Sequence, residues 1–326
     1  MKAMGQRTWR AGEPLVLVEL DDPSPRGGEV RVRTRAIGVN PADWKMREGG
    51  PLRLLARLIG PPLPFVPGVD FAGVVDAVGE GVTGVKVGDR VVGGTDFSRG
   101  QRGSYSDVVI ARPDQLCQLP DGVEFEVGGA LPVVGVTAWM ALVEVGRLAD
   151  AATSLAAKQS VLILGASGGV GQVAVQIANM RGARVVGVCS SKNAEMVRAL
   201  GADVVLDYGA GDPLVQAREH GPYEVVVDCV GGYKGSGCRA LLSPTGRHVI
   251  VAGDKLAAIG QTLIAPVRTR SLLGRATTKR LAPLVEAIAQ GKLRLHIVER
   301  IPLLEVERAH ELSKTGRTTG KIVLIP

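Results

Sequence analysis

The first part of the chain consists of short apolar or alternating runs that are separated by glycine and proline. Such runs predict β-strands, and the glycines between them predict tight turns. We expect strands at residues 15–20, 29–37, 70–78, 91–92 and 103–111. Short strands joined by glycine turns indicate a barrel-like β domain over residues 1 to about 120.

Residues 50–67 interrupt this pattern, because an apolar and basic helical stretch precedes a proline-rich loop. A segment of this kind is either a packed surface insertion or a lid over a substrate entrance, since long loops are only sometimes functional. We favour the packed insertion.

From residue 159 the pattern changes to strands that alternate with helices. Residues 161–164 are apolar and rich in β-branched side chains, which is typical of a buried strand. The glycine-rich segment GASGGVG follows at 165–171, residues 172–181 have one apolar helical face, and residues 184–188 form a second apolar strand. Together they predict a βαβ unit of about 30 residues.

An apolar segment at residues 128–145, which is helix-prone beyond Pro132, precedes the βαβ unit. After the βαβ unit, strands and helices continue to alternate. We expect strands at residues 204–206, 223–230, 247–252, 297–301 and 322–325, and helices at residues 193–200, 281–290 and 305–314. Strands that alternate with helices predict an α/β domain with a doubly wound parallel sheet.

The glycine-rich turn of the βαβ unit predicts a phosphate site. A backbone without Cβ atoms can approach a pyrophosphate closely, and the following helix offers free N–H groups and the positive end of its dipole. We therefore expect a dinucleotide cofactor to contact Ala166, Ser167, Gly168, Gly169, Val170 and Gly171. The alternative is a tight turn that binds nothing.

Composition narrows the class of protein. The chain has 326 residues, of which 45% are hydrophobic, enough for two domains with large cores. The net charge is +7, but basic residues are interleaved with acids and aromatic residues make up 3%, so a nucleic-acid surface is not predicted. The four cysteines form no CxxC pair. No membrane span or signal core is apparent, and we expect a cytoplasmic protein.

Eight motifs occur in an order and spacing that identify a resemblance. They are VNPADWKMREG, PGVDFAGVVDAVGEGVTGVKVGDRVVG, GSYSDVVIA, GVTAWMAL, GASGGVG, ALGADVVLDY, VVVDCVGG and the terminal GKIVL. The chain resembles a zinc-independent medium-chain dehydrogenase/reductase of the quinone oxidoreductase (zeta-crystallin-like) group. The resemblance implies a GroES-like β-barrel catalytic domain, a Rossmann dinucleotide-binding domain, and an active site in the cleft between them.

The same resemblance implies domain boundaries. Both chain ends, residues 1–125 and 267–326, would form the catalytic domain, and residues 126–266 would form the Rossmann domain. Residues 267–275 are alternatively the last strand of the Rossmann sheet.

The sequence argues against a catalytic zinc. Zinc-dependent alcohol dehydrogenases of the superfamily have a cysteine where this chain has Asn40, and Gly-His-Glu where it has Gly68-Val69-Asp70. Catalytic zinc normally needs three protein ligands. The histidines at positions 220, 248, 296 and 310 lie in other segments, so we interpret them as ordinary surface or core residues and expect no metal.

The end of the second Rossmann strand indicates the cofactor. NAD sites usually have Asp or Glu there, whereas this chain has Ser190, Ser191 and Lys192. Hydroxyls and an ammonium suit the 2′-phosphate of NADPH. The resemblance adds Tyr208 as a contact of the adenosine phosphate. The alternative is a solvated turn without preference.

On the substrate side, the resemblance suggests three catalytic residues. Asn40 would face the nicotinamide or the substrate carbonyl, and Asp43 would fix this turn. Lys45 would donate a hydrogen bond to an enolate, or is simply a surface lysine. The tyrosine that many quinone reductases have after the aspartate is missing, and Trp44 is either core or an aromatic wall.

The resemblance also suggests cofactor contacts elsewhere. Thr137 would lie near the nicotinamide, or is a residue at a helix start. Val230, Ala252 and Gly253 follow strands at the edge where open α/β sheets bind ligands, or are sheet core. Lys321 would contact the cofactor, or is a lysine of an edge strand.

These features predict an NADPH-dependent, metal-free reductase that transfers hydride to a quinone or to the C=C bond of an α,β-unsaturated carbonyl. Two alternatives remain: a biosynthetic tailoring enoyl or ketone reductase, and a low-turnover NADPH-binding sensor. The resemblance also implies a homodimer that pairs through an edge strand within residues 268–274. A monomer protected by Arg268 and Arg270 is the alternative.

Overall fold

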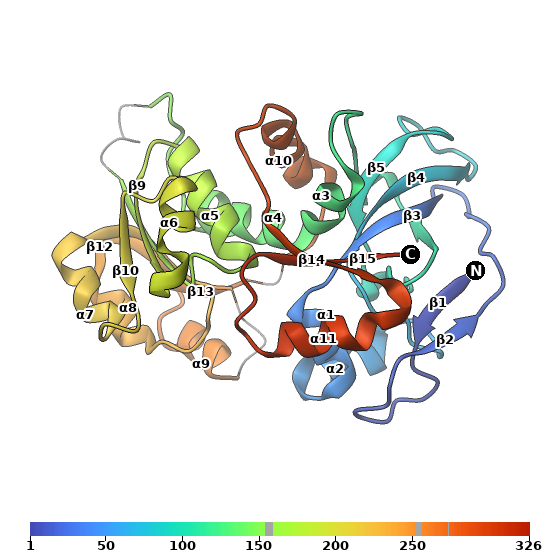
Figure 1. Cartoon of the computed structure of the whole chain (residues 1–326), viewed down its shortest axis with the longest axis horizontal. Coiled ribbons are helices and arrows are strands. Elements are labelled where there is room, and N and C mark those ends of the chain that lie inside the picture. Colours follow the sequence, from blue (N-terminus) through green and yellow to red (C-terminus); the bar gives the residue numbers. More distant parts are fainter. Residues whose placement is uncertain (154–158, 252–255, 273) are drawn as a thin grey trace. The chain divides into compact units, whose positions relative to one another are not determined.

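The computed structural model describes residues 1–153, 159–251, 256–272 and 274–326, which form two compact units. Unit 1 contains residues 1–133, 275–291 and 295–326, and unit 2 contains residues 134–274 and 292–294. Both chain termini therefore belong to unit 1 (Figure 1).

Unit 1 is built on a seven-stranded sheet in the order β14-β15-β3-β4-β5-β7, with β6 paired to β3. Its strands are β3 (Val30–Gly38), β4 (Asp70–Val78), β5 (Arg90–Gly94), β6 (Val108–Ala111), β7 (Leu116–Gln118), β14 (Ile297–Pro302) and β15 (Lys321–Ile325). β14 and β15 are parallel, and the other pairs are antiparallel. A separate two-stranded sheet pairs β1 (Lys2–Gly5) with β2 (Val16–Glu19).

The alternation of β3 explains its place at the centre of this sheet. Val30 and Val32 are buried, and they pack with Phe71 and Val75 of β4 in one apolar cluster. Toward its end β3 becomes continuously buried, because it then contacts β15 as well as β4. The strand thus delivers its last residues into the interior of unit 1.

The helices of unit 1 are α1 (Pro41–Glu48), α2 (Gly50–Ile59), α3 (Phe125–Ala130), α10 (Thr278–Ala289) and α11 (Val306–Lys314). Short 3₁₀ turns occupy Phe97–Arg99, Pro113–Gln115 and Leu303–Glu305. Helix α1 follows β3 directly and lies beside α11, which comes from the opposite end of the chain (Figure 1).

Unit 2 contains a six-stranded parallel sheet in the order β10-β9-β8-β11-β12-β13. Its strands are β8 (Ser160–Leu164), β9 (Arg184–Cys189), β10 (Val204–Asp207), β11 (Tyr223–Asp228), β12 (Leu242–Ile250) and β13 (Thr269–Ser271). The segment Thr269–Ser271 is thus an edge strand of this sheet, and β10 is the strand at its other edge.

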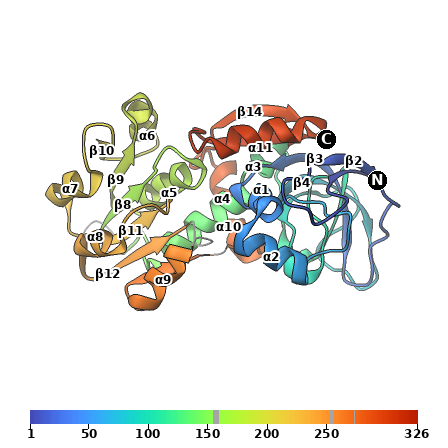
Figure 2. The ribbon, with the colours of Figure 1, turned by 90° about the horizontal axis from the view of Figure 1, so that it is seen from below.

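Helices surround the sheet of unit 2 (Figure 2). They are α5 (Gly169–Met180), α6 (Ala194–Ala199), α7 (Pro213–Ala217), α8 (Gly235–Ala240) and α9 (Leu256–Ile264), with 3₁₀ turns at Ser191–Asn193 and Arg218–His220. Helix α4 (Pro132–Trp139) begins at the boundary of the units and continues into a π-helical segment, Met140–Val145. The predicted architecture, a β domain together with a domain that has a doubly wound parallel sheet, is confirmed.

Two predicted strands are longer in the sequence pattern than in the structure. The strand predicted at residues 103–111 begins only at Val108, because the N–H groups of residues 103–105 donate to carbonyls of residues 66–68. The strand predicted to reach Val230 ends at Asp228, whose Oδ1 accepts hydrogen bonds from the N–H groups of Val230 and Gly231. Side-chain and loop hydrogen bonds end both strands early.

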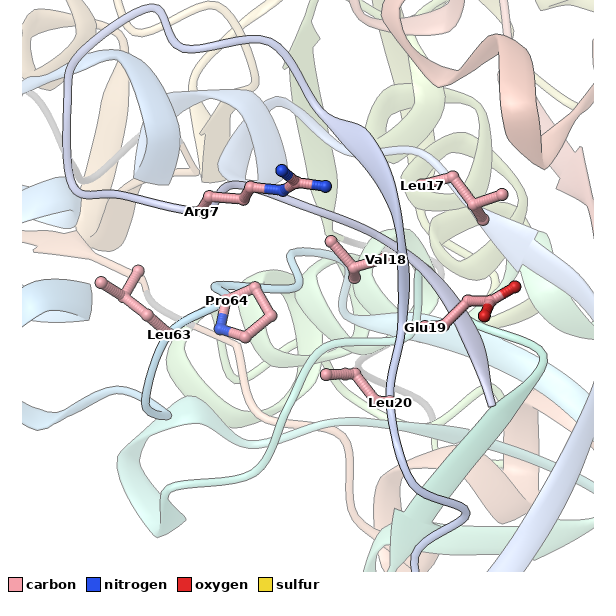
Figure 3. A pocket seen from close by; sticks show the side chains of 7 residues that line it. All are labelled: Arg7, Leu17, Val18, Glu19, Leu20, Leu63 and Pro64. Carbon is pink, nitrogen blue, oxygen red and sulfur yellow. The ribbon is translucent and has the colours of Figure 1, made fainter.

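A cavity of about 620 Å³ lies on unit 1 between β2 and the proline-rich loop that follows α2 (Figure 3). It is lined by Arg7, Leu17, Val18, Glu19, Leu20, Leu63 and Pro64. The next residue of the loop, Phe65, is fully buried and stacks on Trp9, so this end of the loop is anchored in the unit. None of the predicted site residues lines the cavity. In the described part of the chain, no helix is long and apolar enough to cross a membrane.

Candidate active site

Three polar side chains meet inside unit 1, where β3 ends and where β4 and β15 begin. Lys321 Nζ donates to Asn40 Oδ1 at 2.7 Å and to the carbonyl of Val39 at 2.9 Å, and it lies 3.4 Å from Asp70 Oδ2. Asn40 Nδ2 donates to the same Asp70 oxygen at 2.9 Å. Both polar ends of the Asn40 amide are therefore engaged, which fixes its orientation.

Asp43 holds the backbone of the same turn. Asn40 precedes helix α1, and its N–H donates to Asp43 Oδ2 at 2.7 Å, while the Asp43 N–H donates back to the Asn40 carbonyl at 3.0 Å. The Asp43 side chain thus makes the half of a capping box that reaches back to the N–H of the N-cap residue, with Asp in the place of Glu or Gln, while the Asn40 carbonyl rather than its side chain accepts the Asp43 N–H. Asp43 is completely buried, and its Oδ1 has no hydrogen-bond partner among the described residues.

Behind Asp43 the polar contacts continue through three buried side chains. Tyr105 Oη lies 3.1 Å from Asp43 Oδ2 and 3.0 Å from His310 Nε2. Arg47 Nη1 lies 2.6 Å from His310 Nδ1, and Arg47 Nη2 donates to Glu307 at 2.7 Å. Helices α1 and α11 and the loop before β6 thus converge on the Asn40–Asp43 turn.

Burial controls the ionisation of this cluster. It raises the pKa of Asp43 to about 7, with the nearby Asp70 adding to the rise. Burial also raises the pKa of Asp70 and lowers that of Lys321, and the attraction between these two opposes both shifts. The pKa of Tyr105 is held well above its usual value by burial and by Asp43, so it stays a neutral phenol.

Lys45 and Trp44 occupy other positions on α1. The Lys45 ammonium lies 5.7 Å from the centre of the Trp44 ring. Trp44 Nε1 donates to Ser313 of α11 at 3.2 Å, so this side chain is partly buried between the two helices. The cation that contacts Asn40 is Lys321. Lys321 is 3% exposed on β15, which lies between β14 and β3, so its interpretation as a residue of an edge strand is wrong.

The residues at this position do not suit a zinc ion. Asn40 and Val69 offer neither a thiolate nor an imidazole. The remaining carboxylate, Asp70, already contacts the Lys321 ammonium, and a second cation beside it would be repelled. Among the described residues, no group of three or more His, Cys, Asp or Glu side chains is arranged to hold a metal.

In unit 2, the glycine-rich turn has the close approach that the sequence predicts. Gly165 has φ +82°, and a Cβ on Gly171 would lie 2.1 Å from the Gly165 carbonyl oxygen. The turn therefore folds tightly onto the start of α5, whose first residues are Gly169 and Val170. A Cβ added to Gly168 would have one neighbour within 4 Å, the Gly165 carbonyl oxygen at 3.4 Å. An open glycine turn at the N-terminus of a twelve-residue helix fits a pyrophosphate.

The residues predicted to contact the 2′-phosphate of the adenosine ribose lie at the carboxyl ends of β9 and β10. Ser190 follows β9, and Ser191 and Lys192 form an exposed 3₁₀ turn after it. The exposed Tyr208 follows β10, and its N–H donates to the carbonyl of Cys189 at 3.2 Å. The nearest following carboxylate, Glu195, lies on α6.

Two further residues connect the glycine turn to its neighbours, the 3₁₀ turn after β9 and the turn after β11. The sequence pattern predicts neither of them. Asn193 Nδ2 donates to Ser167 Oγ at 3.1 Å and joins the 3₁₀ turn to the glycine turn. Asp228 turns the chain after β11, which places Val230 where a Cβ on Gly165 would be 3.0 Å from Val230 Cγ2. Val230 is half exposed, so its interpretation as sheet core is wrong.

The other predicted cofactor contacts have different outcomes. Thr137 is buried in the last turn of α4, so its interpretation as a helix-start residue is wrong. Ala252 and Gly253 lie outside the described residues.

Unit 1 likewise contains residues that the sequence reading missed: Asp70, Tyr105, Arg47 and His310. The sequence does contain a signal for Asp70, because this residue stands where zinc-dependent relatives have the glutamate of Gly-His-Glu. Tyr105 and His310 lie 205 positions apart and carry no spacing signal.

Comparison with known proteins agrees with both halves of the chain. Residues 26–121 match the alcohol dehydrogenase GroES-like domain, and residues 200–324 match the zinc-binding dehydrogenase family. The chain is 33% identical over 315 residues to the chloroplastic quinone oxidoreductase QR1 of Triphysaria versicolor, covering 95% of this chain and 93% of the relative. It is also 33% identical over 336 residues to a quinone oxidoreductase of Pseudomonas aeruginosa, covering 97% of each.

Solved structures point the same way. The quinone oxidoreductase from Coxiella burnetii has a TM-score of 0.89 at 30% identity and covers 100% of this chain and 99% of that one. The chain belongs to the quinone oxidoreductase group of the medium-chain dehydrogenases/reductases. The mycobacterial protein Rv1454c, solved in complex with NADPH, has a TM-score of 0.80 at 28% identity, and both chains are covered completely. As a member of this group, the protein is an NAD(P)H-dependent oxidoreductase.

We expect His310→Gln to change how the stability of this protein depends on pH. Burial, with Arg47 nearby, lowers the pKa of His310 to about 3, whereas the unfolded chain binds the proton near pH 6.5. Between these values the unfolded state holds more protons, so His310 makes the native state lose stability as pH falls. The stability difference between wild type and variant should therefore shrink by about 1.4 kcal/mol per unit between pH 6 and pH 4.

Urea unfolding at a series of pH values measures this difference. Tyr223→Phe is the control, because it removes a buried hydroxyl in unit 2 without removing an imidazole, and its difference from wild type should stay constant over the same range. A constant difference for His310→Gln as well would contradict the buried neutral imidazole.

Proposed function

We propose that the protein is an NADPH-dependent, metal-free reductase that transfers hydride to a quinone or to the C=C bond of an α,β-unsaturated carbonyl. The observation that carries this proposal is the buried Asn40–Asp70–Lys321 cluster, in which Asn40 stands where zinc-dependent relatives have a cysteine and Asp70 where they have the glutamate of Gly-His-Glu. When bound, NADPH would supply the hydride. The glycine turn at 165–171 would hold its pyrophosphate.

The charges of unit 1 favour an acceptor that can spread negative charge. Lys321 supplies one positive charge, and Asp70 largely balances it. Asp43, with a pKa raised to about 7, is protonated below neutral pH and leaves the cluster close to neutral. Such a cluster stabilises a developing anion less than a divalent metal does. Quinones and enones suit it, because their conjugated carbonyls delocalise the charge.

NADPH is favoured over NADH by the turn after β9. Ser190, Ser191 and Lys192 supply hydroxyl donors and a cation, and no carboxylate stands there to receive a ribose 2′-hydroxyl. The exposed Lys192 is free to approach a 2′-phosphate.

Turnover with a panel of quinones and enones tests the activity. We expect NADPH oxidation with at least one of these classes, at the same rate with and without a chelator, and no stoichiometric zinc by elemental analysis. A requirement for zinc would contradict the metal-free mechanism. Activity confined to larger biosynthetic enones would favour the tailoring reductase, and tight NADPH binding without turnover would favour the sensor.

Lys192→Glu should weaken NADPH binding much more than NADH binding, because it replaces a cation with a charge that repels the 2′-phosphate. The loss of one charge-assisted contact corresponds to about 1.5–3 kcal/mol, or roughly 10- to 150-fold in Kd. Fluorescence titration with each nucleotide measures the effect.

Arg218→Glu is the matched control, because it makes the same charge change at the exposed 3₁₀ turn before β11, at the opposite end of the strands. It should leave the ratio of the two affinities unchanged. An unchanged ratio for Lys192→Glu would show that the phosphate binds elsewhere.

We also propose that two copies pair through β13. This strand is an edge of the sheet of unit 2, and an unprotected edge favours strand pairing. The residues just before it expose large apolar side chains: Leu263 is 75%, Ile264 78% and Val267 75% exposed. A second copy related by two-fold symmetry would cover this surface on both molecules at once.

A single cysteine tests this pairing. Leu272→Pro would not be a specific test of the pairing, because it would also remove the hydrogen bond from the Leu272 N–H to the Ile250 carbonyl within the sheet of a single copy. In a two-fold strand pair Arg270 would approach its own copy, so Arg270→Cys should form a disulfide-linked dimer on mild oxidation, whereas Arg218→Cys should not. Light scattering of the wild type gives the mass; a monomer at micromolar concentration would overturn the proposal.

A further inference from the structure

The buried contacts behind Asp43 have a definite direction. Arginine carries donors only, so the Arg47 guanidinium must donate to His310 Nδ1, 2.6 Å away. Nδ1 is therefore the unprotonated nitrogen, and the neutral ring carries its hydrogen on Nε2. That hydrogen points to Tyr105 Oη, at 3.0 Å, and occupies it as an acceptor. The Tyr105 hydroxyl must then donate to Asp43 Oδ2, at 3.1 Å.

These hydrogen bonds form a string that runs from Arg47 through His310 and Tyr105 to Asp43, and its receiving end is equally constrained. Asp43 Oδ2 accepts from the Tyr105 hydroxyl and from the Asn40 N–H at 2.7 Å, whereas Oδ1 is buried and has no partner among the described residues. A proton on Oδ2 would face two donors and break one of these hydrogen bonds. A proton on Oδ1 leaves both intact.

The start of the string is anchored as well. Arg47 is 2% exposed, and its second nitrogen donates to Glu307 of α11 and to the carbonyl of Glu13 at 3.0 Å. Glu307 also accepts the N–H of Leu15 at 2.6 Å. The guanidinium thus cannot turn away from His310 without breaking a partly buried ion pair and its hydrogen bond to the Glu13 carbonyl.

We propose that Arg47, His310 and Tyr105 are positioning residues, which act on Asn40 through Asp43 by directing the Tyr105 hydroxyl onto Asp43 Oδ2. Asp43 Oδ2 then accepts from the Asn40 N–H and from the Tyr105 hydroxyl, and the carboxyl group takes up its proton on Oδ1. The string conducts no proton, because Arg47 has none to release and His310 keeps one tautomer. The proposal deepens the proposed function, on which its kinetic test rests.

The ionisation of Asp43 reports on the string. The groups that face this carboxyl are Asp70 of β4, Lys321 of β15 and Tyr105 from the loop before β6. His310 of α11 lies behind Tyr105, and Arg47 of α1 lies behind His310. The Tyr105 hydroxyl and Lys321 favour the carboxylate, whereas Asp70 and burial favour the acid. Removing the hydroxyl should therefore raise the pKa of Asp43.

The tautomer is tested on the wild-type protein by long-range ¹H–¹⁵N correlation of the histidine rings, with His310 assigned by its loss in His310→Gln. We expect a neutral ring with hydrogen on Nε2 throughout pH 5–8. A hydrogen on Nδ1, or a ring that becomes protonated in this range, would overturn the proposal.

The effect on Asp43 is tested with Tyr105→Phe, followed by the ¹³C shift of the Asp43 carboxyl group, which is assigned by its absence in Asp43→Asn. The midpoint should rise by about one pH unit. Tyr223→Phe is the matched control, since that tyrosine is also fully buried and its hydroxyl donates to a carbonyl at 2.8 Å. It should leave the midpoint unchanged. No shift in Tyr105→Phe, or equal shifts in both variants, would overturn the proposal.

The pH dependence of kcat/KM for NADPH oxidation gives the functional readout, and its midpoint should move with the carboxyl midpoint. An unmoved profile, with a shifted carboxyl resonance, would show that Asp43 does not act on turnover and would overturn the positioning role. A wild type that reduces no acceptor would refute the proposed function alone, because the two spectroscopic tests decide the string without turnover.

Discussion

The structure of unit 1 depends on burying one ammonium beside one carboxylate. An unpaired charge in a protein interior has too high a free energy to persist. Lys321 and Asp70 can therefore be buried only together and with their remaining hydrogen-bond donors and acceptors satisfied. Asn40, the Val39 carbonyl and the Val133 N–H supply these contacts. The requirement joins β3, β4 and β15 at one point. It also explains Gly38, where a Cβ would lie 2.4 Å from the Gly129 oxygen and 2.9 Å from Asp70 Oδ2.

The sequence predicts the fold well because its signals are local. Apolar period, glycine turns and the βαβ unit each occupy a few consecutive residues, and β4 and β9 begin where the pattern places them. Predictions fail where a single side chain decides. Asp228 ends β11 by accepting N–H groups two and three residues ahead, and the backbone of Gly103–Tyr105 pairs with a distant loop instead of extending β6. Such choices depend on which donor is nearest in space.

The same distinction separates the two candidate sites. The glycine turn of unit 2 is one continuous segment, so its residues can be predicted directly, and the contacts that escape come from Asn193 and Asp228, which lie in other segments. The cluster of unit 1 joins residues up to 281 positions apart. The family resemblance predicts Asn40 and Asp43 as site residues, whereas it predicts Lys321 as a cofactor contact and gives Tyr105 and His310 no role in the site. Periodicity does not reveal such partners, because a buried tyrosine or histidine has the same local pattern as any core residue.

The buried ammonium also limits the chemistry that unit 1 can support. A divalent metal binds the substrate oxygen directly and concentrates positive charge on it, so a metal site can stabilise a localised alkoxide. Lys321 has a single charge, and its three donors point to Val39, Asn40 and Asp70. Asp43 is the group that changes the local charge near neutral pH, and its protonation removes the excess negative charge beside Asn40. A site with this balance suits reactions in which the substrate itself spreads the negative charge. That constraint links the absence of a zinc ligand at Asn40 and Val69 with the conjugated acceptor that we propose.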